Sequence, residues 1–280
     1  MRAVVLNSSG YPEQADLVEP EGRDVLLVLA CGLCGSDVEK IGSAPEGTVL
    51  GHEVVAEADG KRVALVHHQG CGECVRCRAG HESICTEFGA ATIQPGGFAE
   101  RVTAVGGWVD LPDHVDDVLG SYAEPLACVL RGAERVPPGD VLVLGGGFVG
   151  QLFAAVLRRR GDTVYARDPD PARDGPAPPG AVASVVVCAP GAGADALSAV
   201  EPGGSILVFA EAGGLDSGHV YRGEITVTGS RSATRRHMEE AVALLLELDL
   251  PAPLVLPLER FDEGLAAYRN REALRVVFRP

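Results

Sequence analysis

Short apolar runs separated by turn residues fill the first part of the chain and predict β-strands rather than long helices. Residues 25–29 are almost wholly apolar, as in a strand that is buried on both faces. Residues 54–58 and 62–66 form two further runs, and Asp59-Gly60 between them is a typical two-residue hairpin turn. We therefore expect a β-rich N-terminal part.

The pattern changes after residue 140, where apolar strands alternate with helical segments. We expect strands at 141–144, 163–166, 183–189, 205–209 and 225–229, and helices at 151–160, 195–200, 234–248 and 261–268. Alternating strands and helices are typical of a parallel sheet that helices cover. The fold class that we expect is therefore α/β.

A glycine-rich sequence, Gly145-Gly-Gly-Phe148-Val149-Gly150, follows the strand at 141–144 directly. Gly145, Gly147 and Gly150 occupy the glycine positions of G-x-G-x-x-G, and a helix follows. In this context the motif predicts a dinucleotide site, because its glycines form the turn, admit the pyrophosphate and let the helix pack on the strand. The helix N-terminus then faces the phosphates.

Asp168 follows the next predicted strand, eighteen residues after Gly150. A carboxylate at this place can accept hydrogen bonds from the ribose hydroxyls and repel a 2′-phosphate. Arg167 and Arg173 are positively charged and would attract a 2′-phosphate. We expect NAD rather than NADP as the cofactor.

Five prolines between residues 169 and 180 exclude an ordinary helix after this strand. The segment 169–182 suffices for one crossover between parallel strands, which needs about a dozen residues. It has no room for a further helix–strand–helix unit. Against the usual order 3-2-1-4-5-6, we expect the third strand to be absent, the order to be 2-1-4-5-6, and the strand at 163–166 to form the sheet edge.

Composition narrows the classes of partner. The chain has 280 residues, 46% of them hydrophobic, and a net charge of −15. An acidic surface repels phosphate backbones, so we expect no nucleic acid partner. No apolar run reaches the roughly 18 residues of a membrane span. Eight cysteines without a recognisable secretion signal predict a cytoplasmic protein, in which clustered cysteines bind metal.

Four cysteines give the most specific signal in the chain. They have the spacing C-x2-C-x2-C-x7-C and are Cys71, Cys74, Cys77 and Cys85. Close spacing brings three sulfurs to one point, and the fourth completes a tetrahedron. Four thiolates with no open position predict a structural zinc site.

A second candidate metal site combines Cys34, His52 and Glu53. A thiolate, an imidazole and a carboxylate suit zinc, and three protein ligands leave one position open for water or substrate. The hydroxyl of Ser36 lies two residues from the thiolate and could pass on a proton. Two other readings stay open: Cys31 and Cys34 also form a C-x-x-C, which occurs as a redox dithiol, and such a thiol can be simply buried.

Several motifs occur together and in order: Cys34-Gly-Ser-Asp, Gly51-His-Glu53, the four-cysteine lobe, Gly96-Gly-Phe-Ala-Glu100, Glu124-Pro-Leu-Ala-Cys128 and the glycine fingerprint. They cover nearly the whole chain. The sequence resembles the zinc-dependent medium-chain dehydrogenase/reductase superfamily, most closely its polyol branch of sorbitol, threonine and butanediol dehydrogenases.

The resemblance implies a GroES-like β-rich catalytic domain plus a Rossmann doubly wound parallel sheet, the latter lacking a strand here. The catalytic domain would comprise residues 1–116 and 250–280. The Rossmann nucleotide-binding domain would comprise 117–249, with a linking helix at its start.

The resemblance also implies reversible oxidation of a secondary alcohol or polyol, with zinc as Lewis acid and NAD(P) as hydride acceptor. Cys34 and His52 would bind the catalytic zinc, Glu53 and Glu124 would reach it directly or through water, and Ser36 would relay the proton. With the structural zinc in the four-cysteine lobe, each chain would hold two zinc ions. One thiolate and one carboxylate neutralise Zn²⁺, so we expect only one of the two glutamates on the metal at a time.

The chain also departs from the pattern of the polyol branch. Glu39 stands where that branch commonly has a histidine, the link from Cys34 to His52 is shorter than usual, and the Rossmann part is short. Two alternatives therefore stay open: a zinc-free alkene or quinone reductase, and a non-catalytic relative that keeps only the structural zinc. We expect a homodimer or homotetramer that acts on a small-molecule alcohol or polyol.

Overall fold

The computed structural model describes residues 1–22, 25–87 and 92–280, and the chain forms two compact units. The first unit contains Met1–Ala127, Ala233–Glu247 and Ala252–Pro280, and the second contains Cys128–Ser232 and Leu248–Pro251. The predicted domain boundaries differ from this division most at helix α8 (Arg235–Leu244), which belongs to the first unit. Those boundaries stay a prediction.

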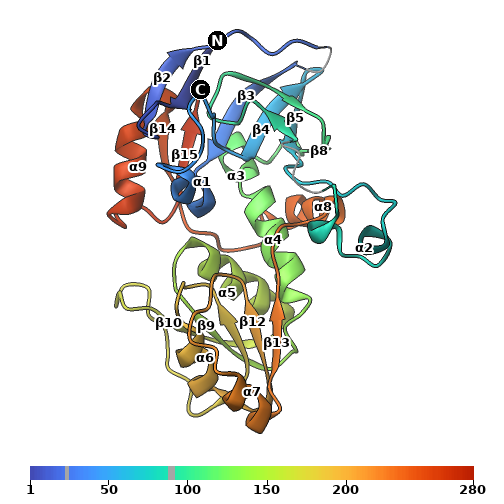
Figure 1. Cartoon of the computed structure of the whole chain (residues 1–280), viewed down its shortest axis with the longest axis vertical. Helices are drawn as coiled ribbons and strands as arrows, with labels where there is room; N and C mark the ends of the chain where they lie inside the picture. Colours follow the sequence, from blue (N-terminus) through green and yellow to red (C-terminus); the bar gives the residue numbers. More distant parts are fainter. Residues whose placement is uncertain (23–24, 88–91) are drawn as a thin grey trace. The chain divides into compact units, whose positions relative to one another are not determined.

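The first unit is rich in strands (Figure 1). Its strands are β1 (Arg2–Leu6), β2 (Pro12–Asp16), β3 (Val25–Gly32), β4 (Glu53–Ala58), β5 (Lys61–Leu65), β6 (Ile93–Gln94), β7 (Arg101–Ala104), β8 (Trp108–Asp110), β14 (Leu254–Pro257) and β15 (Val276–Arg279). Its helices, besides α8, are α1 (Gly35–Lys40), α2 (Val75–Arg78), η1 (Glu82–Ile84), α3 (Asp117–Gly120), η2 (Leu258–Arg260) and α9 (Phe261–Arg269). Helix α4 (Ala123–Ala133) begins in this unit and ends in the second.

The main sheet of this unit runs in the order β14-β15-β3-β4-β5-β8, and β7 pairs with β3 and with β6. The turn between β4 and β5 is Asp59-Gly60, with φ angles of 49° and 74°. Two consecutive left-handed residues are what a type I′ hairpin turn requires. The predicted hairpin is therefore confirmed.

Strand β15, in the C-terminal part of the chain, pairs with β3, in the N-terminal part. It pairs antiparallel with β3, so that Val277 lies opposite Gly32 and Phe278 opposite Cys31. Phe278 also packs on Phe98 and Phe261, with ring centroids 5.6 and 4.8 Å away. This core fixes the end of β3, from which the chain continues to Cys34.

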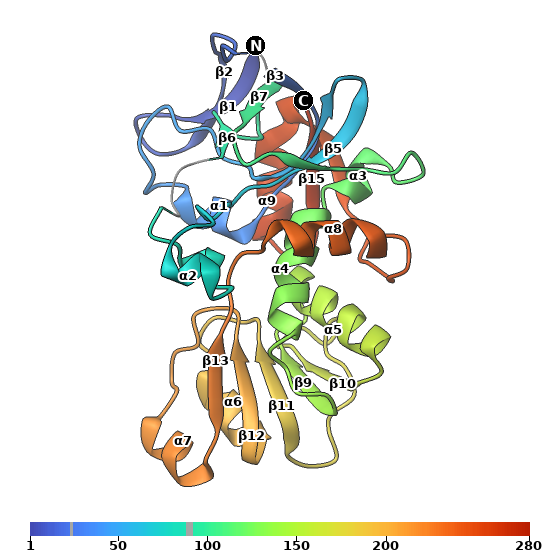
Figure 2. The same cartoon turned by 90° about the vertical axis from the view of Figure 1, so that its right-hand side faces the viewer.

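The second unit contains a parallel sheet of five strands in the order β10-β9-β11-β12-β13, and Figure 2 shows the strands in this order. The strands are β9 (Asp140–Leu144), β10 (Thr163–Arg167), β11 (Val182–Val187), β12 (Val200–Val208) and β13 (Thr226–Gly229). The helices are α5 (Phe148–Arg160), α6 (Gly193–Ala199) and α7 (Ser217–Gly223). Helix α5 contacts β9 and β10, and α6 contacts β11 and β12.

The sheet order confirms that the third strand of the usual doubly wound sheet is absent. When the strands are numbered by their positions in the usual doubly wound sheet, the observed order reads 2-1-4-5-6, and β10 forms the edge. The described residues 168–181 between β10 and β11 contain no strand. The proline-rich segment therefore makes a single crossover, as its length predicts.

Strands β2 and β14 were not expected from the sequence. Strand β2 is mostly polar, and β14 is a short apolar run that follows Pro253 and ends at Pro257. Each forms because it lies beside a strong partner, β1 for β2 and β15 for β14. Separately, none of the helices in the described part of the chain combines the length and apolar character that crossing a membrane requires.

Candidate functional site

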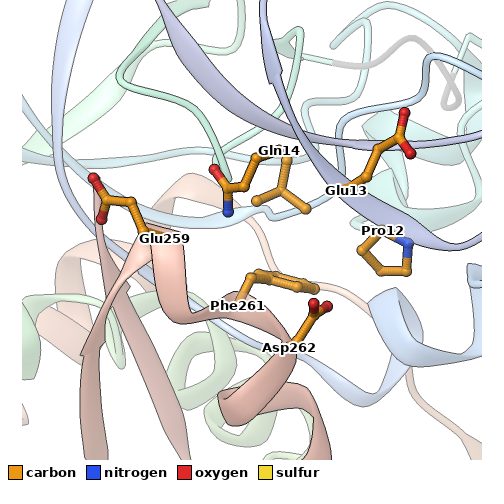
Figure 3. Close-up of a pocket in the computed structure, with 7 residues that line it drawn as sticks. Pro12, Glu13, Gln14, Glu259, Phe261 and Asp262 are labelled. Atoms are coloured by element: carbon orange, nitrogen blue, oxygen red, sulfur yellow. The ribbon is translucent and has the colours of Figure 1, made fainter.

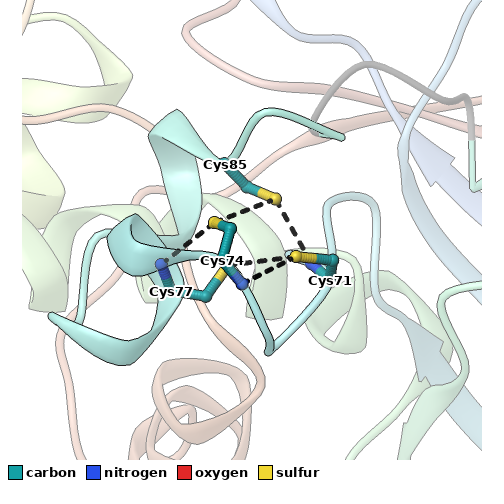
Figure 4. A group of neighbouring side chains, drawn as sticks. All are labelled: Cys71, Cys74, Cys77 and Cys85. Carbon is teal, nitrogen blue, oxygen red and sulfur yellow. Dashed lines mark hydrogen bonds between the residues drawn. The ribbon is translucent and has the colours of Figure 1, made fainter.

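The four predicted zinc-binding cysteines converge in the first unit (Figure 4). Their sulfurs lie within 4.8 Å of one another, with 4.0 Å between the Sγ atoms of Cys71 and Cys77 and 3.9 Å between those of Cys74 and Cys85. Four sulfurs about 2.3 Å from a zinc ion stand about 3.8 Å apart at the corners of a tetrahedron. The spacing of the sulfurs therefore fits zinc.

Backbone groups prepare two of these sulfurs for metal binding. The N–H groups of Cys77 and Cys71 donate to Sγ of Cys74 (3.4 Å) and Cys85 (3.3 Å), and they lower the pKa of both thiols, that of Cys74 to about 6. Burial raises the pKa of Cys77 to about 12, so a metal has to displace that proton. The lobe is thus arranged for a cation that binds thiolates.

Replacing Cys85 with serine should remove about one zinc ion per chain, because the other three sulfurs no longer complete a tetrahedron. We expect the midpoint of thermal unfolding to fall by about 5 °C or more, since a loss of 1 kcal/mol corresponds to about 2–4 °C in a chain of this size. Zinc analysis by mass spectrometry and thermal scanning check both effects. Cys188→Ala is the matched control and should keep its zinc; unchanged metal content in the Cys85 variant would contradict the assignment.

The predicted catalytic residues Cys34, His52 and Glu53 also come together in the first unit. Cys34 caps the N-terminus of α1, and His52 and Glu53 lie at the start of β4. Their ligand atoms lie within 4.8 Å of one another, and His52 and Glu53 are buried. Burial and the nearby Glu53 carboxylate raise the pKa of the Cys34 thiol, so a thiolate there needs a cation beside it. The donor set therefore fits zinc.

Asp37 positions two of these residues and was not expected to have this role. Its carboxylate is 1% exposed and accepts hydrogen bonds from the N–H groups of Cys34 and Gly51, both at 3.2 Å. It also lies 3.2 Å from Nδ1 of His52. Metal-binding histidines usually donate their second ring N–H to such a group. This contact leaves Nε2 of His52 for the metal.

Arg275 forms a buried ion pair with Glu53. Both side chains are at most 2% exposed, and Nη1 of Arg275 donates to the Glu53 carboxylate. Nη2 of Arg275 donates to the Ser121 carbonyl at 2.9 Å, and its guanidinium lies 4.9 Å from the centre of the Tyr122 ring. Burial lowers and the Glu53 charge raises the pKa of Arg275, with a net increase. No local sequence pattern indicates this pair, because its members are 222 residues apart.

Three more residues that the sequence analysis named in this region lie outside the group of Cys34, His52 and Glu53. Ser36 is exposed, and its hydroxyl donates to Sγ of Cys34 at 3.3 Å. Glu124 is buried in the first turn of α4 and does not belong to the group of three. Cys31 is fully buried in β3, as a small apolar side chain would be.

His67 is a further neighbour that the sequence analysis did not single out. Its ring lies 4.5 Å from that of His52 and 3.7 Å from that of His68, measured between centroids. Burial and the two neighbouring histidines lower the pKa of His67 to about 2, so the ring is neutral. A pocket elsewhere in the first unit shares no residue with the candidate metal site (Figure 3). It is lined by Val4, Pro12, Glu13, Gln14, Glu259, Phe261 and Asp262.

The glycine-rich loop lies in the second unit, between β9 and α5. Gly147 is the residue that precedes the first turn of α5, and no side chain caps the helix there. A Cβ atom at Gly147 would meet nothing within 4 Å, whereas one at Gly150 would overlap the Gly145 carbonyl. Phe148 and Val149 form the start of α5. The loop has the close packing and the open helix N-terminus that a phosphate group needs.

Asp168 follows β10 beside this loop. Its carboxylate accepts hydrogen bonds from the N–H groups of Gly146 (2.7 Å) and Asp170 (2.9 Å) and from Arg173. Burial raises the pKa of Asp168, but these three partners lower it overall. The predicted ribose-binding carboxylate is therefore ionised and already hydrogen-bonded within the protein.

Comparison with known proteins agrees with this geometry. The family model for the alcohol dehydrogenase GroES-like domain matches residues 21–113. D-altritol 5-dehydrogenase of Agrobacterium fabrum is 33% identical over 174 residues, which cover 52% of this chain and 50% of that protein. L-threonine 3-dehydrogenase of Aeromonas hydrophila is 32% identical over 171 residues, which cover 52% and 50%. The chain thus spans about half the length of the curated relatives that it matches.

The fold is also found among solved structures. Galactitol-1-phosphate dehydrogenase of Escherichia coli superposes with a TM-score of 0.83 and 23% identity, with 100% of both chains covered. The expected fold class, a GroES-like β-rich part plus a Rossmann-type sheet, is confirmed. By its motifs and its matched relatives, the chain is similar to the zinc-dependent medium-chain dehydrogenases, with D-altritol 5-dehydrogenase and L-threonine 3-dehydrogenase among its relatives, and it has the fold of galactitol-1-phosphate dehydrogenase.

Proposed function

We propose that this protein is a zinc-dependent oxidoreductase that moves hydride between a secondary alcohol or polyol and a nicotinamide cofactor. The observation that carries the proposal is the group of Cys34, His52 and Glu53, whose ligand atoms lie within 4.8 Å of one another. The glycine-rich loop in the same chain and the relatives named D-altritol 5-dehydrogenase and L-threonine 3-dehydrogenase support it.

Each residue of the group would have a defined part. Cys34 and His52 would hold the zinc ion, and Asp37 would keep the His52 ring in place through Nδ1. When bound, zinc supplies a Lewis acid that lowers the pKa of a substrate hydroxyl, and the nicotinamide supplies a hydride acceptor. The Ser36 hydroxyl, exposed beside Cys34, would carry the released proton towards water.

The total charge of zinc and its ligands limits how many of the two glutamates, Glu53 and Glu124, can bind the metal at once. A Cys34 thiolate and one carboxylate neutralise Zn²⁺, and a second carboxylate would disfavour a negatively charged substrate oxygen. The ion pair with Arg275 gives Glu53 a partner when it is off the metal. We therefore propose that only one of Glu53 and Glu124 reaches the zinc at a time.

The cofactor proposal is two zinc ions per chain and NAD rather than NADP. We expect kcat/KM for NAD to exceed that for NADP by about tenfold, because the ionised Asp168 disfavours a 2′-phosphate by about 1.4 kcal/mol. Steady-state kinetics with both cofactors and one substrate check this. A higher kcat/KM for NADP would contradict it.

We also expect weaker cofactor binding than in relatives with a third strand, since adenine loses one wall of its site.

The test of the function is NADH production from a panel of diols, sugar alcohols, cyclitols and 3-hydroxy amino acids. Zinc content is measured on the same preparation. Two zinc ions with turnover support the dehydrogenase, one zinc ion with turnover of an activated alkene supports the zinc-free reductase, and one zinc ion without turnover supports a non-catalytic relative. We also propose a small-molecule alcohol or polyol as substrate, a homodimer or homotetramer, and a cytoplasmic location, where the eight cysteines stay reduced.

A further inference from the structure

Two neighbouring glycines of the glycine-rich loop, Gly146 and Gly147, differ in how much space surrounds them. A Cβ atom at Gly147 would meet nothing within 4 Å, so the loop is open where the pyrophosphate would approach. A Cβ atom at Gly146 would overlap the carbonyl oxygen of Arg173 and lie 3.0 Å from its Cβ. The turn that follows β10 therefore packs against Gly146, one residue before the open position at Gly147.

The same arginine occupies the carboxylate that a ribose would need. Oδ1 of Asp168 accepts from Nε (3.3 Å) and Nη2 (3.2 Å) of Arg173 and from the N–H of Asp170 (2.9 Å). Oδ2 accepts from the N–H of Gly146 at 2.7 Å. Each carboxylate oxygen offers about two acceptor positions, so these hydrogen bonds fully occupy Oδ1 and half occupy Oδ2. The Asp168 and Arg173 side chains are only 8% and 11% exposed.

The turn has attachments that do not involve the arginine side chain. The N–H of Asp168 donates to Oδ1 of Asp174 at 3.1 Å, and the N–H of Gly175 donates to the Ala166 carbonyl at 3.2 Å. The N–H of Arg173 donates to the Asp170 carbonyl at 2.9 Å. Truncating the Arg173 side chain should therefore free the Asp168 carboxylate and leave the turn in place.

We propose that Arg173 determines cofactor affinity and specificity by competing with the adenosine ribose for Asp168. The ribose hydroxyls gain Oδ1 of the carboxylate only when the guanidinium leaves it, which weakens the binding of NAD. The guanidinium also offsets part of the negative charge of Asp168, so the carboxylate rejects a 2′-phosphate less strongly than it would alone. The inference rests on the proposed function in one respect, that the ligand is a nicotinamide dinucleotide.

The test compares the parent protein with Arg173→Ala by isothermal titration calorimetry. The probes are ADP-ribose, which carries the free 2′-hydroxyl, and 2′-phospho-ADP-ribose. In Arg173→Ala the Kd of ADP-ribose should fall about tenfold, because a charge-assisted hydrogen bond partner of Asp168 has been removed. The Kd of 2′-phospho-ADP-ribose should stay or rise, so the preference for ADP-ribose widens by about tenfold or more.

The matched control is Arg158→Ala. Arg158 is exposed near the C-terminal end of α5, and its truncation removes the same charge from the same unit. Neither Kd should change in this variant. A change of both Kd values in Arg158→Ala equal to that in Arg173→Ala would reduce the effect to net charge and overturn the inference.

Other outcomes separate the inference from the function. An unchanged or higher Kd of ADP-ribose in Arg173→Ala, with NAD turnover intact in the parent, overturns the inference and leaves the function standing. Absence of NAD and ADP-ribose binding in both proteins overturns the inference together with the nicotinamide step of the function. Thermal unfolding of each variant shows that the fold is kept.

Discussion

Replacing Cys34 with serine is expected to lower kcat/KM for alcohol oxidation by about a thousandfold or more and to leave the thermal midpoint nearly unchanged. A metal ion contributes several kcal/mol to a transition state with a developing negative charge, and about 4 kcal/mol is a thousandfold in rate. Cys34 lies at the N-terminus of α1, outside the strands that form the core. Steady-state kinetics and thermal scanning measure these two effects, and zinc analysis of the same preparation measures whether the ion is lost.

Two variants serve as controls for this result. Cys31→Ala changes a buried cysteine in β3, three residues before Cys34, and should keep both zinc ions. Glu124→Ala should reduce activity less than Cys34→Ser, because Glu124 lies outside the group of three. Equal loss of catalytic zinc in the Glu124 and Cys34 variants would show that Glu124 binds the metal directly. Activity of Cys34→Ser within tenfold of the parent would exclude a catalytic zinc at this place.

Replacing Arg275 with leucine is expected to destabilise the first unit by about 3–5 kcal/mol. The change leaves the Glu53 carboxylate buried without its ion-pair partner, and removing one member of a buried pair has this magnitude. The thermal midpoint should fall by about 10 °C, at about 2–4 °C per kcal/mol. Thermal and denaturant unfolding measure the loss.

The matched control for this variant is Arg279→Leu, which alters an exposed arginine at the end of β15, four residues further along the chain, and should change the midpoint little. The double variant Glu53→Gln with Arg275→Leu should recover part of the stability, because the uncompensated charge is gone. If the two substitutions in the double variant simply add, the members of the pair are not coupled and our reading of the pair is wrong.

Local patterns were sufficient to predict the framework of both units. The glycine fingerprint between an apolar strand and a helix predicted β9 and α5, and five prolines predicted the missing third strand. The two metal-ligand groups followed from ligand spacing, because Cys71–Cys85 and Cys34–Glu53 are each close in sequence. Such signals depend on neighbours along the chain, and the sequence shows them directly.

Residues that act through distant partners could not be predicted. Arg275 directly precedes β15 and has no distinguishing sequence pattern; the pairing of β15 with β3 brings it to Glu53. Asp37 lies in the Cys34-Gly-Ser-Asp motif, but its contact with His52 depends on how the loop before β4 folds back. The sequence analysis considered Arg173 only for its effect on a 2′-phosphate, because nothing in the sequence shows that the turn returns to Gly146. Tertiary contacts decide all three cases.

The pairing of β15 with β3 has a consequence for the order in which the protein is made. The second unit is almost continuous in sequence, so it can fold while the chain is still being synthesised. The first unit has to wait, since β3 and Glu53 emerge early and meet their partners, β15 and Arg275, only when residues 275–279 leave the ribosome. Until then the thiol and imidazole of the metal group lie in an incomplete sheet. A premature stop before β15 should therefore produce a folded second unit and an unfolded first unit that a protease removes.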